Sequence, residues 1–247
     1  MSSKILRQRK TGYIRKGFVF ILVVLSLQSR AQMRDNINLP DHDDKFYHLG
    51  IALIFNTSHF QVTPHPNLLL SDSVLSISPE NTGGFGLAGL HTFNINRHLE
   101  FRIVFPQLMF SYKNLTYSTT FPSGEQTTAT KKVESILLGF PLQVKFLSDR
   151  MENFRFYILG GVNYQYDLSS NATARKADDL VKLNPYDWSI EAGIGFQFFF
   201  PVFILSPELK ISNGIINVHH RDPNLIYSNT IDKLRSRMIV FSLIFEG

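Results

Sequence analysis

The feature that most constrains this chain is an alternation of apolar and polar residues with a period of two, repeated in eight long runs. In residues 99–112, "LEFRIVFPQLMFSY", Leu99 and Phe101 alternate with Glu100 and Arg102. Apolar residues at every second position would encircle a helix, whereas in a strand they all lie on one face. No stretch carries a sustained 3.6-residue period. The sequence therefore predicts an all-β fold.

The spacing of the runs predicts the topology. The runs are 46–60, 82–96, 98–112, 132–147, 153–167, 185–200, 202–213 and 235–245. Short turns alternate with long polar segments, which are 61–81, 113–131, 168–184 and 214–234. An even number of strands with short turns at one end and long loops at the other is typical of outer-membrane barrels. We predict an eight-stranded antiparallel transmembrane β-barrel with short periplasmic turns and long extracellular loops.

A soluble β-sandwich would also alternate, with its apolar face inward. Three features favour the membrane barrel. The apolar face is almost unbroken over about 10 to 12 residues per run, which is longer than the usual strand of about 5 to 6 residues. Aromatic residues gather near both ends of the runs, as they do at the two interfaces of a membrane. The third feature is an export signal ahead of the runs.

The first 31 residues predict this export. Residues 1–31 contain seven basic and no acidic side chains, and the apolar stretch 18–27 within them is too short to span a bilayer. Ser29 and Ala31 supply small side chains for cleavage before Gln32. We predict a signal peptide at 1–31, a polar periplasmic segment at 32–45 and a barrel at 46–247. The predicted location is the cell outer membrane, after export through the inner membrane and signal-peptide cleavage.

The net charge of the whole chain is misleading about partners. A pI of about 9.4 suggests an acidic partner such as nucleic acid. Without residues 1–31, however, the chain has 18 basic and 20 acidic residues, a formal charge of −2. We therefore expect no nucleic-acid partner. The chain has no cysteine, which excludes a disulfide framework and a zinc–thiolate site.

Charged residues opposite the apolar face predict a filled lumen. An eight-stranded barrel is just wide enough for side chains to fill its interior. Five acidic and four basic residues fall on this parity, and opposite charges in a poorly solvated space should pair. The predicted structural charge network comprises Glu100, Arg102, Lys145, Arg155, Asp167, Asp187, Glu191, Glu208 and Lys210.

Two further features of the runs need a local explanation. Pro106, Pro141 and Pro207 each remove a ladder hydrogen bond, which predicts a bulge at each. His91 shares the apolar parity of its run with Phe93. Either a bulge near the glycines of "TGGFGLAGL" shifts the phase, or His91 lies near a membrane interface; the sequence leaves both open.

No group of residues predicts catalysis or metal binding. His219, His220 and Asp222 in the last long segment match no zinc spacing, and neither does the stretch 41–44, "DHDD", before the first run. Both groups are interpreted as solvated polar segments. The chain lacks a G-x-S-x-G motif. No helix is expected after the glycine-rich stretch "ENTGGFGLAG" (80–89), so a phosphate-binding loop is not predicted there. We expect no enzyme activity, no metal and no cofactor.

Several segments resemble, in order, the PorT (SprT) family. They include "LEFRIVFPQLMFSYKNLTY" (99–117), "PYDWSIEAGIGFQFFFPVFILSPELKISNGIINV" (185–218) and "IDKLRSRMIVFSLIFE" (231–246). The resemblance covers nearly the whole chain from residue 46 onward. It implies a small outer-membrane barrel of the type IX secretion and gliding machinery of Bacteroidota, without active-site residues to carry over.

The leading hypothesis is therefore a non-enzymatic accessory or assembly component of the type IX secretion system. Its expected partners are outer-membrane lipid and other secretion-system envelope proteins. The alternative is a small OmpA/OmpX-like barrel that acts as an adhesin or surface-binding protein through its long loops. An enzyme acting on lipid or surface polymer comes third, and a diffusion pore fourth.

One loop segment is a candidate contact surface. Leu225, Ile226 and Tyr227 are apolar for an exposed loop and could form a contact patch. The alternative is that this loop folds over the barrel mouth as a lid.

Overall fold

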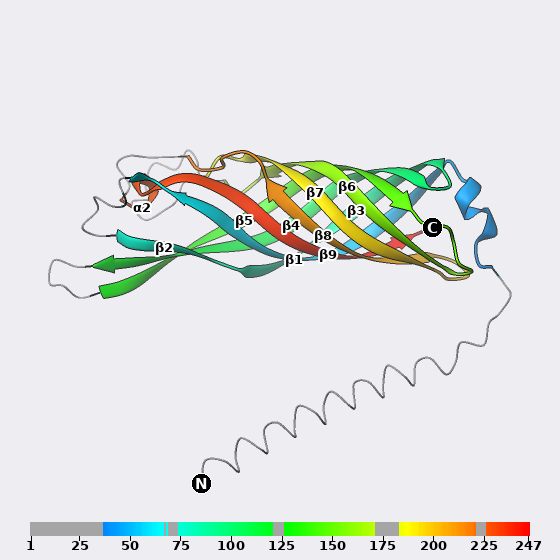
Figure 1. Cartoon of the computed structure of the whole chain (residues 1–247), viewed down its shortest axis with the longest axis horizontal. Coiled ribbons are helices and arrows are strands. Elements are labelled where there is room, and N and C mark those ends of the chain that lie inside the picture. Colours follow the sequence, from blue (N-terminus) through cyan, green and yellow to red (C-terminus); the bar gives the residue numbers. More distant parts are fainter. Residues whose placement is uncertain (1–36, 67, 69–73, 121–125, 171–182, 221–225) are drawn as a thin grey trace, which may run out of the picture. The chain divides into compact units, whose positions relative to one another are not determined.

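The alternating runs form strands that close into a ring. In the computed structural model the strands are β1 (Tyr47–Pro64), β2 (Val74–Glu80), β3 (Thr82–Asn96), β4 (Leu99–Thr120), β5 (Gln126–Leu147), β6 (Phe154–Asp167), β7 (Tyr186–Phe199), β8 (Ile204–Gly214) and β9 (Ile231–Glu246). Among the described residues, eight strands follow one another in the order β4-β3-β1-β9-β8-β7-β6-β5, and β5 pairs back to β4. All of these pairings are antiparallel, which confirms the predicted eight-stranded barrel (Figure 1).

The structure describes residues 37–66, 68, 74–120, 126–170, 183–220 and 226–247. The predicted signal peptide at 1–31 lies outside these residues and stays a prediction. Asn38–Gly247 form the unit that contains the barrel. No helix in the described part of the chain has the length and apolarity needed to cross a membrane.

The strand that the sequence did not predict, β2, continues β3. Both lie along β4: Phe85 of β3 is opposite Phe110, and Glu80 of β2 is opposite Asn114. Between β2 and β3, the register of pairing with β4 shifts by one residue. β2 therefore lengthens a strand of the ring without adding a ninth strand to it.

The predicted long segments 61–81 and 113–131 are partly strand, which corrects the expected loops. β4 and β5 stay paired as far as Thr120 opposite Gln126, well beyond the last β5–β6 pair, Leu137 opposite Asp167. We call this extension, formed by β2 with residues 114–120 of β4 and 126–133 of β5, the collar. Its strands reach past the ends of β6 and β7 (Figure 1).

The two faces of the wall differ in polarity, as the alternation predicts. On β7, Trp188, Ile190 and Ile194 point outward and are exposed, whereas Asp187 and Glu191 are buried in the lumen. An apolar outer face with a polar interior is the arrangement of a barrel in lipid and the reverse of a soluble sandwich.

Pro106 lies in a bulge, as predicted. Between the pairs Leu90 opposite Val104 and Ala88 opposite Gln107, β4 contains one residue more than β3. The same shift occurs on the β5 side. As a result Phe105 and Pro106 are both exposed, and the inward parity changes from even to odd residue numbers along β4.

Pro141 faces the same bulge, because the register of β4 and β5 shifts between Leu142 and Gly139. The bulge predicted at Pro207 is wrong, since Pro207 is opposite Leu243 without a register shift. Each of the two prolines lies beside a gap in the ladder, because the described pairs give Pro141 no partner in β4 and Pro207 none in β7. A proline is tolerated beside such a gap, because the hydrogen bond that it cannot donate is not required there.

His91 keeps the outward parity that its sequence position predicts. Burial alternates along β3 without a phase shift, so the glycines do not turn His91 inward. Its Nδ1 atom lies 2.7 Å from the hydroxyl oxygen of Tyr47, an outward residue at the start of β1. The tyrosine therefore provides a hydrogen-bond partner for a polar side chain on the apolar face.

The topology predicts which ends of the barrel are accessible from outside the cell. Because the chain contains no cysteine, a single introduced cysteine gives no background labelling. We expect Thr128→Cys, on the exposed tip of the collar, to react with a membrane-impermeant maleimide on intact cells. Asp149→Cys, in the exposed short turn between β5 and β6, should react only after the outer membrane is permeabilised. Labelling at 149 but not at 128 would invert the topology.

Candidate functional site

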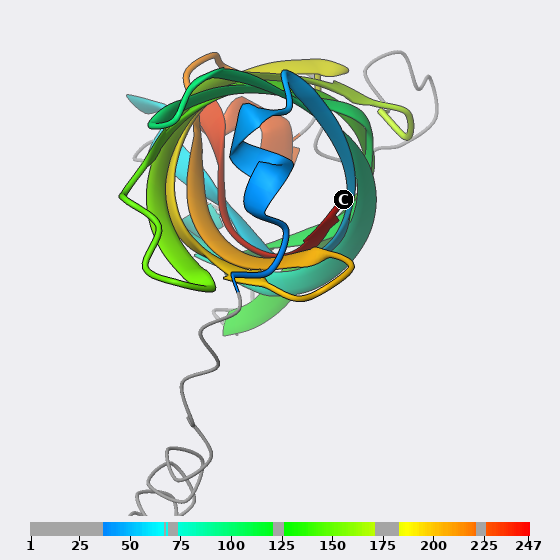
Figure 2. The ribbon, with the colours of Figure 1, turned by 90° about the vertical axis from the view of Figure 1, so that its right-hand side faces the viewer.

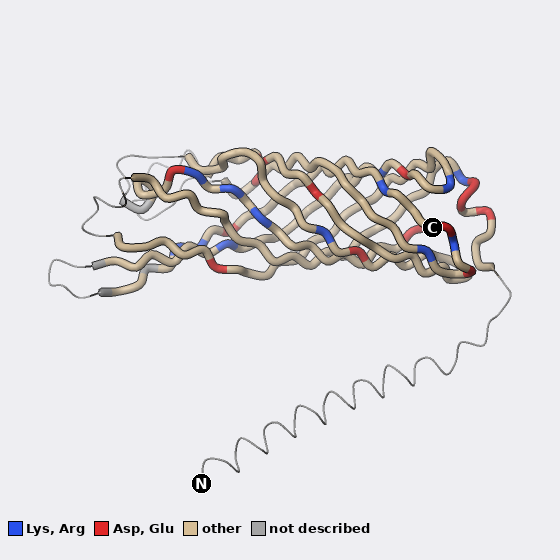
Figure 3. The backbone as a smooth tube through the Cα atoms, in the orientation of Figure 1, with Lys and Arg blue, Asp and Glu red and all other residues tan. Residues whose placement is uncertain are grey.

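All nine charged residues predicted to face the lumen are buried in it. None is more than 9% exposed, and Arg102 and Lys145 are fully buried. Charged positions of both signs are distributed over the wall and gather at the end where the C-terminus lies (Figure 3). Buried charges are stable only when they are paired and hydrogen-bonded, so their contacts decide what this interior does.

Seven of the nine form two groups of ion pairs. In the first group, Glu100 lies 2.5 Å from the Lys145 ammonium and 4.0 Å from the Arg155 guanidinium. In the second group, Arg102 is 2.7 Å from Glu208, Lys210 is 3.9 Å from Glu208, and Lys210 is 3.3 Å from Glu191. Each cation of both groups therefore has a carboxylate within ion-pairing distance.

Glu246 joins the two groups, and the sequence analysis missed it. Its carboxylate lies 3.3 Å from Arg102 and 4.0 Å from Lys145, and it accepts hydrogen bonds from Gln197 at 3.3 Å and Ser206 at 3.2 Å. The last predicted strand stopped one residue earlier, at residue 245. The signal was present, because position 246 shares the inward parity of β9.

Neutral side chains complete the network. The Tyr157 hydroxyl donates a 2.8 Å hydrogen bond to Glu208, and the Lys145 ammonium lies 4.4 Å from the centre of the Tyr157 ring. Gly195 makes room for this ring, because a Cβ atom at that position would overlap it. Glu191 accepts hydrogen bonds from Gln143 at 2.6 Å and Asn163 at 3.1 Å. These contacts hold the acidic groups in fixed positions.

Asp167 and Asp187 lie apart from this network, near the long-loop end. Asp187 accepts a hydrogen bond from the Ser236 hydroxyl, and Asp167 accepts one from the Ser169 hydroxyl at 2.8 Å. Both line a small cavity of about 20 Å³ together with Lys113. Lys113 is buried as well, and the sequence analysis missed it because the predicted run ended at residue 112.

The segment before β1 closes the short-turn end of the barrel. It contains a 3₁₀ helix, η2 (Pro40–Asp44), which lies across the barrel mouth (Figure 2). Asp43 pairs with Arg155 at 3.0 Å, and the Asn38 amide donates a 2.8 Å hydrogen bond to the Asn153 side chain. Arg150 donates to the backbone carbonyls of Asn38 and, at 3.1 Å, of Leu39. We call residues 38–44 the cap.

The cap is not the solvated segment that its sequence, "DHDD", suggested. His42 is 1% exposed, and its ring packs 4.6 Å from the ring of His48 and 6.0 Å from that of Phe199. A histidine between acidic residues gives no sequence signal for such burial. The burial depends on the position of the barrel mouth, which the topology sets.

Electrostatics strengthen the cap at neutral pH. The neighbouring His42 side chain, followed by Arg155 and Arg150, lowers the pKa of Asp43 below its ordinary value. Burial lowers the pKa of Arg150. Because the folded state favours the ionised Asp43 carboxylate, this contact is fully present at neutral pH and weakens as the pH falls below about 3.9.

An apolar cluster closes the long-loop end. It is formed by buried residues of the extended strands and of the segments that cross the mouth: Phe60, Val74, Leu115, Tyr117, Leu183, Val218, Ile231 and Leu234. Ile216 packs against this cluster, so part of the last long segment forms the lid that the sequence left as an alternative. Of the predicted contact patch, Leu225 lies outside the described residues, as do the side chains of Ile226 and Tyr227 in α2 (Ile226–Asn229).

Of the residues weighed as a metal site in the last long segment, the structure describes His219 and His220. His219 is buried and its Nε2 atom is 2.9 Å from the Ser228 hydroxyl, but Ser228 is 0% exposed and closed to any substrate. His220 is exposed, and Asp222 lies outside the described residues. Within the described ranges, no group of three or more histidine, cysteine or acidic residues is arranged to hold a metal ion.

The closed ring, apolar outer face and charged lumen agree with a comparison against known families. Residues 30–220 match the family model described as outer membrane protein beta-barrel domain. The chain belongs to this family. As an outer membrane beta-barrel protein it resides in the outer membrane, and its outer face contacts lipid.

Solved structures with similarity to this beta-barrel protein are small outer-membrane proteins. OprG from Pseudomonas aeruginosa is 13% identical, with 80% of this chain and 94% of that chain covered and a TM-score of 0.43. Neisserial surface protein A is 13% identical, with 79% of this chain and 95% of that chain covered and a TM-score of 0.38. Ail of Yersinia pestis is 8% identical, with 82% of this chain and 100% of that chain covered and a TM-score of 0.38. No curated protein matches the sequence. The family assignment rests on the family model.

The position of Glu246 predicts a large effect on barrel stability. Glu246→Ala would remove the carboxylate that joins the ion-pair groups of Arg102 and Lys145. We expect the substitution to lower the free energy of unfolding by about 3–5 kcal/mol. The matched control is Asp232→Ala, whose exposed side chain is 3.9 Å from exposed Lys233, and we expect a cost of under about 1 kcal/mol. Urea unfolding in detergent, followed by fluorescence of the single tryptophan, measures both. Equal midpoints for the two variants would contradict a structural role for the network.

The closed lumen predicts negligible conductance. The cap, the charge network and the apolar cluster occupy successive levels of the barrel interior, so we expect no water-filled path through the described residues. Purified protein in a planar bilayer should give no stable current steps, while a general porin in the same bilayer serves as the positive control. Reproducible open-channel currents from this protein would show that the interior opens.

Proposed function

We propose that this outer-membrane barrel is a non-enzymatic accessory or assembly component of the type IX secretion system. The observation that carries the proposal is the closed lumen combined with the end-to-end resemblance to the PorT family. A barrel whose interior is filled by paired charges cannot conduct folded cargo. A role in secretion therefore has to be exerted through contacts made by its surfaces.

The closed Ser228–His219 pair supports the non-enzymatic part of the proposal. A nucleophile has to reach the substrate, and a fully buried hydroxyl does not. The ion-paired groups of the lumen likewise lie between the cap and the apolar cluster. The proposed partners are other secretion-system envelope proteins that meet the barrel at its loops, its outer wall or its cap.

The loop around α2 remains our candidate contact surface. Leu225, Ile226 and Tyr227 are consecutive apolar residues in the sequence. Ile226 and Tyr227 belong to α2, which ends shortly before the start of β9. Apolar residues grouped at the rim of a barrel are a typical protein contact. The neighbouring apolar cluster fixes the base of this loop, which would hold the contact residues in place.

Deletion of the gene tests the secretion role. We expect type IX cargo to accumulate in the periplasm while other outer-membrane proteins stay at normal levels. A census of secreted and periplasmic proteins by mass spectrometry measures both. Normal cargo release in the deletion strain would overturn the assignment.

A substitution tests the contact patch separately. Replacing Leu225, Ile226 and Tyr227 together with serine should give a folded barrel that fails to restore secretion in the deletion strain. The matched control is Val202→Ser, because Val202 is 81% exposed but lies in a short turn at the other end of the barrel. If the loop variant restores secretion as well as the control does, the contact lies elsewhere.

The collar supports a second candidate function, surface binding. Its three strands project beyond the rest of the ring and carry exposed polar residues such as Thr127, Thr128 and Thr130. A rigid projecting sheet suits the adhesin role of a small OmpA/OmpX-like barrel. Normal secretion in the deletion strain, together with reduced attachment of its cells to surfaces, would favour this function.

A further inference from the structure

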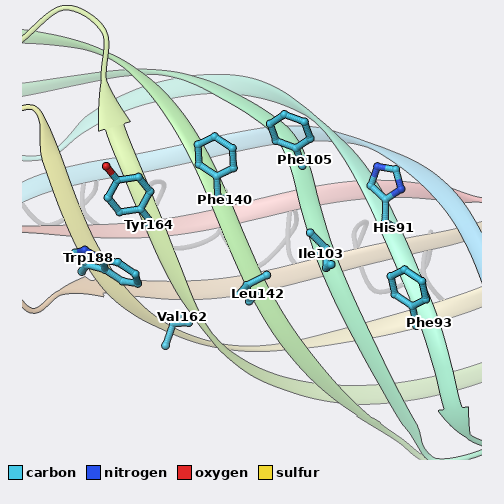
Figure 4. Close-up of a pocket in the computed structure, with 9 residues that line it drawn as sticks. All are labelled: His91, Phe93, Ile103, Phe105, Phe140, Leu142, Val162, Tyr164 and Trp188. Carbon is cyan, nitrogen blue, oxygen red and sulfur yellow. The ribbon is translucent and has the colours of Figure 1, made fainter.

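The outer wall carries a hollow of about 640 Å³ that crosses five neighbouring strands, β3 to β7 (Figure 4). Its lining residues are His91, Phe93, Ile103, Phe105, Phe140, Leu142, Val162, Tyr164 and Trp188. All of them lie on the outward parity, so the hollow opens to the bilayer and not to the lumen. Its volume falls within the range of about 300–1,000 Å³ that is usual for sites that bind small molecules.

The register of the strands builds the floor and the rim of this hollow. Ile103, Leu142 and Val162 are direct cross-strand partners, and they form an aliphatic floor. The rim is an aromatic ladder: Phe105 stacks on Phe140 at 5.2 Å, Tyr164 follows at 6.2 Å, and Trp188 lies 5.1 Å from Tyr164. Contacts between successive rings make this rim rigid. The bulge at Phe105 and Pro106 leaves Phe105 exposed, at the start of the ladder.

The two ends of the hollow differ in polarity. At one end, the Tyr47 hydroxyl lies 2.7 Å from the Nδ1 atom of His91. At the other end, Trp188 is two residues inside the start of β7, near the long loops. The Trp188 indole N–H and the Tyr164 hydroxyl have no hydrogen-bond partner in the described part of the chain. The hollow therefore has an aliphatic floor and, at the long-loop end, two hydrogen-bond donors without a partner in the described part of the chain.

We propose that this hollow binds one acyl chain of a lipid in the leaflet at the long-loop end. The acyl chain lies on the floor formed by Ile103, Leu142 and Val162. The carbonyl oxygen of the ester or amide linkage of the lipid accepts hydrogen bonds from Trp188 and Tyr164. The occupant is a lipid because this wall faces the hydrocarbon of the outer membrane, and because the linkage of a lipid offers the carbonyl acceptor that the Trp188 and Tyr164 donors require. The site does not depend on the proposed secretion role, and either can fail without the other.

The single tryptophan makes the site directly observable. Trp188 is the only tryptophan of the chain, so its fluorescence reports on this hollow alone. Purified protein in dodecyl maltoside micelles is titrated with phosphatidylcholine that carries bromine on one acyl chain, which quenches a tryptophan in contact with it. We expect saturable quenching at about one lipid per protein, reversed by unbrominated phosphatidylcholine.

Two matched substitutions separate a site from general lipid contact. Val162→Phe fills the floor of the hollow and should weaken the lipid affinity about tenfold or more. Ile239→Phe makes a similar change on β9, where Ile239 is 49% exposed on the outer wall but does not line the hollow, and it should leave the affinity unchanged. Both positions face lipid, so neither substitution disturbs the charged interior.

The possible outcomes decide the proposal. Quenching that rises linearly with lipid and never saturates would overturn it, as would identical titrations for the wild type, Val162→Phe and Ile239→Phe. Cross-linking of Val162→Cys to a second copy of the chain at the same lipid content would also overturn it, because the hollow would then hold protein. Saturable quenching that only Val162→Phe weakens would establish the site.

Discussion

The structure depends on one constraint: in hydrocarbon no backbone N–H or C=O group can be left without a partner. The pairing of β4 with β5 meets this constraint, because it converts an open sheet into a ring without edges. Local features then adapt to the ring. The extra residue at Pro106 is absorbed as a bulge, and Pro141 and Pro207 lie beside gaps in the ladder, where no hydrogen bond from them is needed.

Closure into a ring of eight also determines the chemistry of the interior. The lumen is narrow enough for side chains to fill, and charges that enter it lose their hydration. The cations of the two ion-pair groups are stable because each has a carboxylate beside it, and because Glu246 joins the pairs from several strands into one network. The cap at one end and the apolar cluster at the other then exclude water from these pairs. We therefore propose that this interior is structural and that the function of the protein lies on its outer surfaces.

The outer surfaces are specialised in different ways. The collar presents a polar sheet beyond the membrane, and the wall from β3 to β7 presents an aromatic ladder beside an aliphatic floor. The ladder depends on register: neighbouring strands place Phe140, Tyr164 and Trp188 next to one another although they are far apart in the sequence. His91 is stable on the apolar face because the same register places Tyr47 within hydrogen-bonding distance.

The sequence by itself determined the fold class, the number of strands in the ring and the face on which each charge lies, because alternation is a local property of each strand. It did not determine which charges meet. Glu246, Lys113 and His42 were missed or misplaced, since their burial depends on how far the strands extend and on what covers each mouth. The collar was missed because threonine- and serine-rich strands outside the membrane have no continuous apolar face to reveal them. Only the closed ring, by fixing the register between distant strands, decided which residues pair in the lumen and which line the hollow on the outer wall.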